Sequence, residues 1–293
     1  YAYWNQSFYA EGKKWCQKAY EKKELMPELI KINANIVHAM YFETPYESIN
    51  FSRQLLKIDD QLPDVYTDIG YDYNRLNQYS KAIPELEKAL EIYEKWGIRP
   101  LWSTNYASLG VAYLHTGQYE KVKKLYRKAE EYFPYDLLLS YYQCLFALAE
   151  GDSVNYDKYL EKAIRIAREN SWTDADIAAK MGEGYAEIGK NDMAEESYRK
   201  ALSLEPEEPA RMNDLAYLLI DSERNMPEGL QLADKALGSD PENYKYLDCK
   251  GWGLYKRGKY KEALELLERS WELKPVYKHE IFLHLEAAKK AVA

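Results

Sequence analysis

The order of polar and apolar residues over 244–275 predicts two short amphipathic helices joined by a tight turn. Leu247, Gly251 and Leu254 fall near the i, i+4 and i+7 positions of one helical face. The polar residues 256–259 include a glycine where the C-cap of this helix is expected. The first predicted helix therefore ends in this turn, and a second helix follows it.

The second predicted helix carries Tyr260, Ala263, Leu267 and Ser270 at the same period, and Pro275 keeps the chain from simply continuing it. Small and large residues alternate along the two facing surfaces, so the helices can interdigitate at short range. The glycine on the first helix has no side chain, which allows the second helix to approach its backbone closely. We therefore expect a closely packed helical hairpin.

The same frame of glycine, alanine and tyrosine positions recurs upstream through most of the chain. The copy anchored at Cys144 is weaker than the others, and the copy anchored at Ala216 has one residue inserted in its turn. Successive anchor positions are separated by 40, 34, 38, 34 and 35 residues. The anchors are Gly70, Gly110, Cys144, Gly182, Ala216 and Gly251.

Six copies with a core period of 34 resemble a tetratricopeptide-repeat (TPR) array over about residues 28–278. The resemblance implies an all-α fold, a right-handed α-solenoid of helix-turn-helix repeats that stack on their neighbours. About seven repeats are expected, of which the first and fourth are divergent. An N-terminal helix or half repeat (1–27) precedes them, and a C-terminal capping helix (279–293) follows. This makes about 15 helices and no sheet, and the C-terminal half is similar to TPR segments of bacterial proteins.

The N-terminal helix is expected over residues 1–24, with an apolar side formed by large aromatic residues. The residues placed on that side are Tyr3, Phe8, Trp15 and Tyr20. The chain begins at Tyr1 without a methionine, so we expect a piece of a longer protein or a processed one. Its compartment stays open between the cytoplasm and the periplasm.

Charge and hydropathy narrow the classes of partner. The net charge of −8 argues against nucleic acid or an anionic membrane as the main partner, because phosphate binding needs a basic surface. No run of 18 apolar residues occurs, so no membrane insertion is expected. The 29 tyrosines recur at several repeat positions, where a long side chain fills the space between helices.

The sequence carries no motif for catalysis or for a cofactor. It lacks a phosphate loop, GxGxxG, GxSxG and HExxH. His279 and His284 are five residues apart, which places them about 140° apart around a helix and prevents the usual shared metal site. The three cysteines form no CxxC and are interpreted as structural thiols. We therefore predict that the chain is not an enzyme and holds no cofactor or metal.

The resemblance implies a binding groove, because in TPR folds the first helix of each pair lines the concave face. The groove is expected to be aromatic and of mixed charge, which suits an extended peptide or a partner helix. A carboxylate clamp is not assigned, because Asn74, Arg75 and Lys180 lie in separated repeats. The candidate groove residues are Tyr71, Asn74, Arg75, His115, Tyr141, Lys180, Asn213, Tyr217, Trp252 and Tyr255.

Two alternatives stay open at this point. Each aromatic candidate could instead pack between successive first helices. The array could also dimerise its parent protein, because residues 137–149 carry no charge and an exposed apolar patch marks a contact surface. The leading hypothesis is a scaffold that binds a protein or peptide segment, and a homodimer is the alternative.

Overall fold

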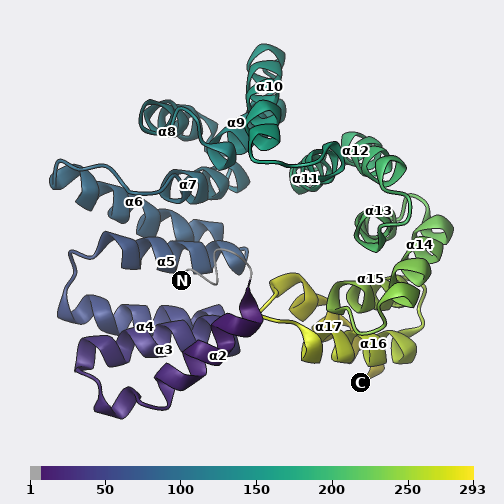
Figure 1. Ribbon diagram of the computed structural model, residues 1–293, viewed down its shortest axis with the longest axis horizontal. Helices are drawn as coiled ribbons and strands as arrows, with labels where there is room; N and C mark the ends of the chain where they lie inside the picture. The colour runs from purple at the N-terminus through teal and green to yellow at the C-terminus, as the bar shows by residue number, and fades with distance from the viewer. Residues whose placement is uncertain (1–7) are drawn as a thin grey trace. The chain divides into compact units, whose positions relative to one another are not determined.

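The structure is a computed structural model that describes residues 8–293. Within this range it is all-α and contains no strand, which confirms the predicted fold class (Figure 1). Sixteen α-helices and the 3-10 turn Lys23–Leu25 follow one another along the described residues. The helices are α2 (Tyr9–Tyr20), α3 (Glu28–Phe42), α4 (Pro45–Ile58), α5 (Pro63–Arg75), α6 (Tyr79–Lys95), α7 (Thr104–His115), α8 (Tyr119–Tyr132), α9 (Leu137–Glu150), α10 (Ser153–Glu169), α11 (Asp174–Glu187), α12 (Asn191–Leu204), α13 (Pro209–Asp221), α14 (Met226–Ser239), α15 (Tyr244–Lys256), α16 (Tyr260–Leu273) and α17 (His279–Val292).

The chain divides into two compact units, with the division inside α10. Unit 1 contains the described residues up to Leu160 together with Pro275–Tyr277. There α3 packs on α4, α5 on α6 and α7 on α8, while α5, α7 and α9 contact one another in succession. Unit 2 contains Glu161–Lys274 and Lys278–Ala293. There α11, α13 and α15 each pack on the helix that follows, and α11, α13, α15 and α17 contact one another in succession.

Each unit thus has two layers. We call the odd-numbered helices from α3 onward the first-helix layer, and the even-numbered helices that pack behind them the second-helix layer. Helices α5, α7, α11, α13 and α15 each touch both the helix that follows and the next first helix, so their side chains on the remaining side are available for other contacts. This side is where a functional site is to be sought.

The anchor glycines lie where two helices cross at short range. A Cβ atom at Gly251 would lie 2.8 Å from Cγ of Leu267, and one at Gly182 would lie 2.8 Å from the ring of Tyr198. At Gly110 the ring of Tyr126 occupies the same space. In each case the large partner stands sixteen residues after the glycine. The predicted alternation of small and large residues is therefore confirmed at these crossings.

The turns after the first helices share one backbone feature. The residue seven positions after each anchor has a positive φ, which lets the chain reverse directly after the helix. At the last turn, the N–H of Lys259 donates to the carbonyl of Leu254 over 3.0 Å. Four of these six residues are glycines, which adopt this conformation without a steric penalty. The residues and their φ values are Asn77 (55°), Gly117 (72°), Gly151 (83°), Gly189 (73°), Glu223 (55°) and Gly258 (76°).

The predicted apolar side of the N-terminal helix is wrong at two residues. Phe8 is 57% exposed and Trp15 is 52% exposed. Gly12 and Cys16 are buried instead, and they share one face of α2 because they are four residues apart. The ring of Tyr41 packs directly against Gly12, so the small side chains rather than the aromatic ones face the next helix.

The prediction also included Tyr20 and Tyr3, and only Tyr20 lies among the described residues. The ring of Tyr20 stacks on His38 with 3.7 Å between centroids, so this residue does contact the neighbouring helix. Tyr3 lies outside the described residues, as do the other residues of 1–7.

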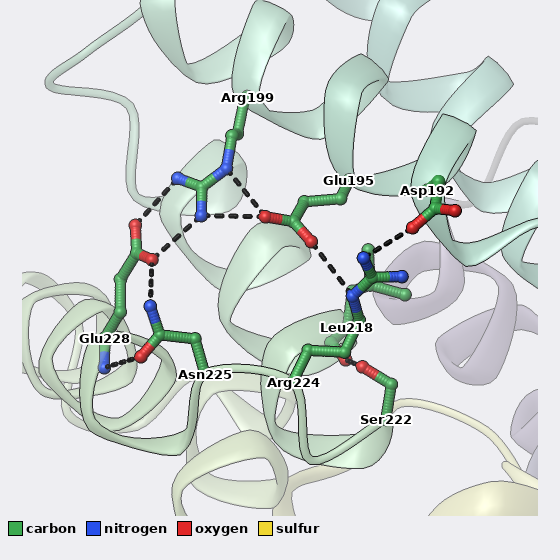
Figure 2. A network of polar contacts seen from close by, with 8 residues as sticks. All are labelled: Asp192, Glu195, Arg199, Leu218, Ser222, Arg224, Asn225 and Glu228. Atoms are coloured by element: carbon green, nitrogen blue, oxygen red, sulfur yellow. Dashed lines mark hydrogen bonds and ion pairs between the residues drawn. The ribbon is translucent and has the colours of Figure 1, made fainter.

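Unit 2 is held along its second-helix layer by an ion-pair network (Figure 2). Arg199 on α12 contacts Glu195 at 2.9 Å and reaches Glu228 on α14 with two hydrogen bonds of 2.8 Å. Arg224, in the turn before α14, contacts Glu195 at 3.2 Å and Asp192 at 2.5 Å. Two successive repeats are therefore tied by charged side chains outside the first-helix layer.

Candidate binding groove

A groove of about 670 Å³ runs over the first-helix layer of unit 2. Its walls come from α11, α13, α15 and the first turn of α17, so four successive elements contribute to it. Three of the predicted residues line it, namely Lys180, Asn213 and Tyr217. The structure thus brings together side chains that are more than thirty residues apart in the sequence. The role of these residues in binding stays a prediction.

The helix α17 makes the floor of the groove polar. The hydroxyl of Tyr217 donates to Oε1 of Glu280 over 2.5 Å and lies 3.4 Å from Nε2 of His284. His284 is buried, and its Nδ1 lies 3.0 Å from Oδ1 of the buried Asp248 on α15. These contacts attach the last helix to α13 and α15 through hydrogen bonds.

Burial, followed by the charge of Glu280, raises the pKa of the Tyr217 hydroxyl well above its ordinary range. The hydroxyl therefore stays protonated and acts as the donor to the carboxylate. A group held in this way fixes the position of α17 and offers little to a ligand.

The predicted aromatic residues Trp252 and Tyr255 stack beside the groove. Their rings lie 4.8 Å apart, and the indole also stacks on His284 at 4.0 Å. The indole N–H donates to Asp221 over 2.9 Å. The indole therefore has protein partners for its ring and for its N–H, which favours a packing role for these residues over contact with a ligand.

Two acceptors on α13 face the groove without a hydrogen bond from any described residue. Asn213 is 7% exposed, and its Oδ1 atom is buried without a donor. Asp214, the next residue, also lines the groove, and no hydrogen bond or ion pair to its carboxylate is present in the described part of the chain. Buried polar atoms are nearly always paired, so the Oδ1 atom of Asn213 calls for an explanation, while the Asp214 side chain is partly exposed to the groove.

Burial raises the pKa of the Asp214 carboxyl from 3.8 to about 6, although Lys245 and Arg211 act in the opposite direction. The carboxylate is therefore ionised at neutral pH in a site that disfavours its charge. A cation placed beside it would be stabilised more strongly than at an exposed surface.

The predicted residues of unit 1 lie on its own first-helix layer and are engaged within it. Nδ2 of Asn74 donates to the carbonyl of Ser108 over 2.9 Å, although its Oδ1 has no donor among the described residues. Arg75 pairs with Asp72 at 2.8 Å within α5. These residues connect or brace first helices.

The aromatic candidates of unit 1 differ in exposure. Tyr71 is 45% exposed and stays available to a ligand. His115 is exposed and stacks on Tyr79 with 4.1 Å between ring centroids. Tyr141 is 5% exposed on α9, so it offers almost no surface to a partner.

The uncharged helix α9 is buried rather than exposed. No residue from Leu137 to Ala149 is exposed, and Tyr141, Cys144 and Leu145 are nearly inaccessible. A helix segment without charged residues can be buried on all sides or can expose an apolar patch, and residues 137–149 are buried or half-buried. The homodimer alternative therefore lacks the exposed patch on which it rested.

Sequence reasoning passed over two groove residues, Asp214 and Glu280, and the contacts that His284 makes with Tyr217 and Asp248. Glu280 and His284 belong to a helix that was interpreted as a simple cap, yet they are four residues apart and so share a face. Asp214 stands among many acidic residues, and only its place between two neighbouring first helices distinguishes it. The helical spacing of Glu280 and His284 could have identified these two residues.

The three cysteines do not line the groove. They are free and buried, and burial raises the pKa of Cys144 to about 12. Among residues 8–293 no three metal-ligating side chains are grouped to hold an ion. No helix in the described part of the chain combines the length and the apolar character needed to cross a membrane.

Comparisons with known proteins agree with this architecture. The tetratricopeptide repeat family matches residues 61–134 and again residues 175–208. A curated TPR repeat-containing protein of Pseudomonas aeruginosa is 32% identical over 98 residues, which are 33% of this chain and 16% of that protein. The chain thus aligns with a small part of the relative's length.

Two solved structures of tetratricopeptide-repeat proteins are also similar to this chain. A tetratricopeptide repeat protein from Parabacteroides merdae is 13% identical and aligns over 93% of this chain and 99% of its own, with a TM-score of 0.50. The TPR domain of Sgt2 from Aspergillus fumigatus is 20% identical and aligns over 41% of this chain and 80% of its own, with a TM-score of 0.37.

Proposed function

Because the chain is a tetratricopeptide-repeat protein, we propose that it is a non-catalytic scaffold that binds a segment of a partner protein in the groove of unit 2. The observation that carries the proposal is the buried, unpaired Oδ1 of Asn213 in an open groove that the neighbouring carboxylate of Asp214 also lines. A groove that served packing alone would be expected to pair this atom internally.

The shape of the groove supports a peptide or helical segment rather than a small molecule. It follows four first-layer elements in succession, so its length grows with the number of repeats. Its walls mix aromatic and charged residues, a composition suited to main-chain and side-chain contacts along a segment. In a longer parent protein, such binding would regulate an attached module.

One exposed aromatic residue stands at the rim of the groove. Trp172 precedes α11 and is 37% exposed, and it lines the same space as Lys180. Aromatic side chains give a large contact area for little loss of entropy, and binding hot spots are enriched in them. Trp172 is therefore the residue whose truncation should weaken binding without unfolding the chain.

The test uses a random library of 12-residue peptides displayed on phage and selected on the 293-residue chain. Recovered peptides are labelled, and their affinity is measured by fluorescence anisotropy. Trp172→Ala should weaken binding at least about tenfold, which corresponds to about 1.4 kcal/mol. The matched control is Trp102→Ala in unit 1, where the side chain is 66% exposed and lies outside the groove.

Failure to recover any peptide would contradict the proposal. Equal binding to Trp172→Ala and to the unchanged chain would move the site away from the groove. A melting curve for each variant confirms that both remain folded.

A further inference from the structure

We infer that the segment bound in the groove of unit 2 presents a lysine or arginine side chain, whose cationic head is held by Asp214 and Asn213. The inference rests on the proposed function and names the chemistry of its ligand. It is carried by the two acceptors and by the pairing of every other carboxylate that lines the groove.

The carboxylates around Asp214 have partners within the protein. Asp176 on α11 pairs with Arg211, and Glu183 pairs with Lys180 at 2.9 Å. On α15, Asp248 is bound by His284. Glu280 accepts from Tyr217, as described above, which leaves Asp214 as the carboxylate without a partner among the described groove residues.

The cations around Asp214 are also accounted for. Arg211 is shared between Asp176 and Glu205, the latter at 2.8 Å, so it is not available as a full partner. Lys245 at the start of α15 is exposed and forms no ion pair with a described residue, and its charge acts on Asp214 from a distance. Lys278 and His279 line the same groove and make contacts of their own.

The second acceptor makes the site specific for a donor. Oδ1 of Asn213 is buried and lacks a hydrogen-bond donor among the described residues, and the residue lines the same groove as its neighbour Asp214. A guanidinium carries five N–H donors and an ammonium carries three, so either can serve a carboxylate and an amide oxygen together. A metal ion would find too few ligands here, because one carboxylate and one amide do not complete its coordination.

The test uses peptides recovered from the phage-displayed library. Those that bind the unchanged chain should share a lysine or arginine, and changing that residue to glutamine should weaken binding at least about tenfold. Asp214→Asn should cause a similar loss. Combining the two changes should cost little more than either alone, because both remove the same contact.

A neighbouring charge provides a test of opposite sign. Lys245→Gln removes a competing cation beside Asp214, so it should strengthen binding of the basic peptide by about two- to fivefold. The matched control for Asp214→Asn is Glu196→Gln, which also removes one negative charge, on the exposed surface of α12 outside the groove. It should leave the affinity unchanged.

The outcomes of these experiments distinguish a failure of the inference from a failure of the proposed function. If peptides are recovered and Trp172→Ala weakens them, but neither a basic residue nor Asp214 matters, the groove binds peptides and the inference is overturned. If Glu196→Gln weakens binding as much as Asp214→Asn does, the effect is general electrostatics and the inference also fails. If no peptide is recovered, the proposed function itself fails. Asn213→Leu, which keeps the side-chain volume, should weaken basic peptides while the melting temperature holds.

Discussion

The first-helix layers of the two units use their polar side chains differently. In unit 1, Asn105 on α7 donates to Thr67 on α5 over 2.7 Å, and Ser103 donates to Asp136 before α9 over 2.8 Å. These bonds run from one repeat to the next and bury polar groups in pairs. In unit 2, Asn213 on the equivalent layer has an acceptor that no described donor reaches. Asn35, Asn74 and Gln143 in unit 1 also have such an acceptor, but Asn213 lines a groove next to the carboxylate of Asp214.

The difference shows that a polar residue on this layer is not evidence of a binding site by itself. Where neighbouring repeats supply the partner, the residue contributes to stacking. Where they do not, a buried acceptor costs free energy that a ligand can recover. Asn74 in unit 1 is held by its bond to Ser108 although its Oδ1 is also unpaired, whereas Asn213 in unit 2 lies in a groove next to Asp214. The two residues are therefore distinguished by their surroundings, not by their residue type.

The largest expected effect tests whether the two units are packed by the same rule. Gly110→Leu in unit 1 and Gly251→Leu in unit 2 should each destabilise the chain by about 3 kcal/mol, because the side chain overpacks a close helix crossing. The measurement is unfolding by denaturant, followed by circular dichroism. Gly238→Ala is the control, since a Cβ there meets nothing within 4 Å, and it should be neutral or stabilising. Unchanged unfolding of Gly251→Leu would mean that this glycine faces solvent.

The next prediction compares a polar contact between helices of unit 2 with one of unit 1. Asp248→Ala leaves His284 buried without its partner and should cost about 2 to 3 kcal/mol of unfolding free energy. Asn105→Ala in unit 1 should cost about 1 kcal/mol, because it removes one neutral hydrogen bond. Equal costs in thermal melts of the two variants would show that the Asp248–His284 contact is no stronger than an ordinary tie between repeats.

A smaller effect depends on pH. The folded chain holds a proton on Asp214 up to about pH 6, whereas an unperturbed carboxyl releases it near 3.8, so the folded state binds more protons between these values. The contribution of Asp214 to the free energy of unfolding therefore falls as the pH rises from about 4 to 6. Asp214→Asn removes this loss and should be more stable than the unchanged chain at pH 7 by about 1 to 2 kcal/mol.

Melting temperatures of both proteins from pH 4 to pH 7 check this prediction. The gain should be small at pH 4 and should grow toward pH 7. Lys245 and Arg211 act to lower the pKa of this carboxyl, and Glu183 acts to raise it. A gain that is constant with pH would assign the effect to packing.

The smallest effect concerns the second-helix layer. Arg199→Gln breaks the contacts to Glu195 and Glu228 in Figure 2 and should cost less than about 1 kcal/mol, because the side chains are largely solvated. Added salt should shrink this cost further by screening the charges. A cost that persists at 1 M sodium chloride would show that the network contributes packing in addition to charge.

The fold could be predicted because its signals are local and repeated. Gly251 and Leu267 stand sixteen residues apart in one hairpin, and the same pair of positions recurs at Gly70 and Leu86, so a chance pattern is excluded by repetition. The N-terminal helix has no second copy, and there the residue size misled: the small Gly12 faces the neighbouring helix, while the large Trp15 faces solvent.

The candidate site could be predicted only in part. Its position on the first-helix layer follows from the repeat frame, and Asn213 and Tyr217 were found in this way. Whether a side chain is paired depends on atoms in other repeats, as with Tyr217 and Glu280, which are 63 residues apart. No spacing rule within one repeat contains that information.

The positive-φ turns have a consequence for the speed at which the protein forms. Each turn reverses the chain within seven residues of its anchor, so a helical hairpin makes its contacts among residues that are close in sequence. Chains dominated by such contacts fold fast, because little loop entropy is lost before contacts form. During synthesis, a hairpin such as α5–α6 can therefore close while the following repeat is still being made. The array can thus be assembled one hairpin at a time, in the order in which the ribosome delivers it.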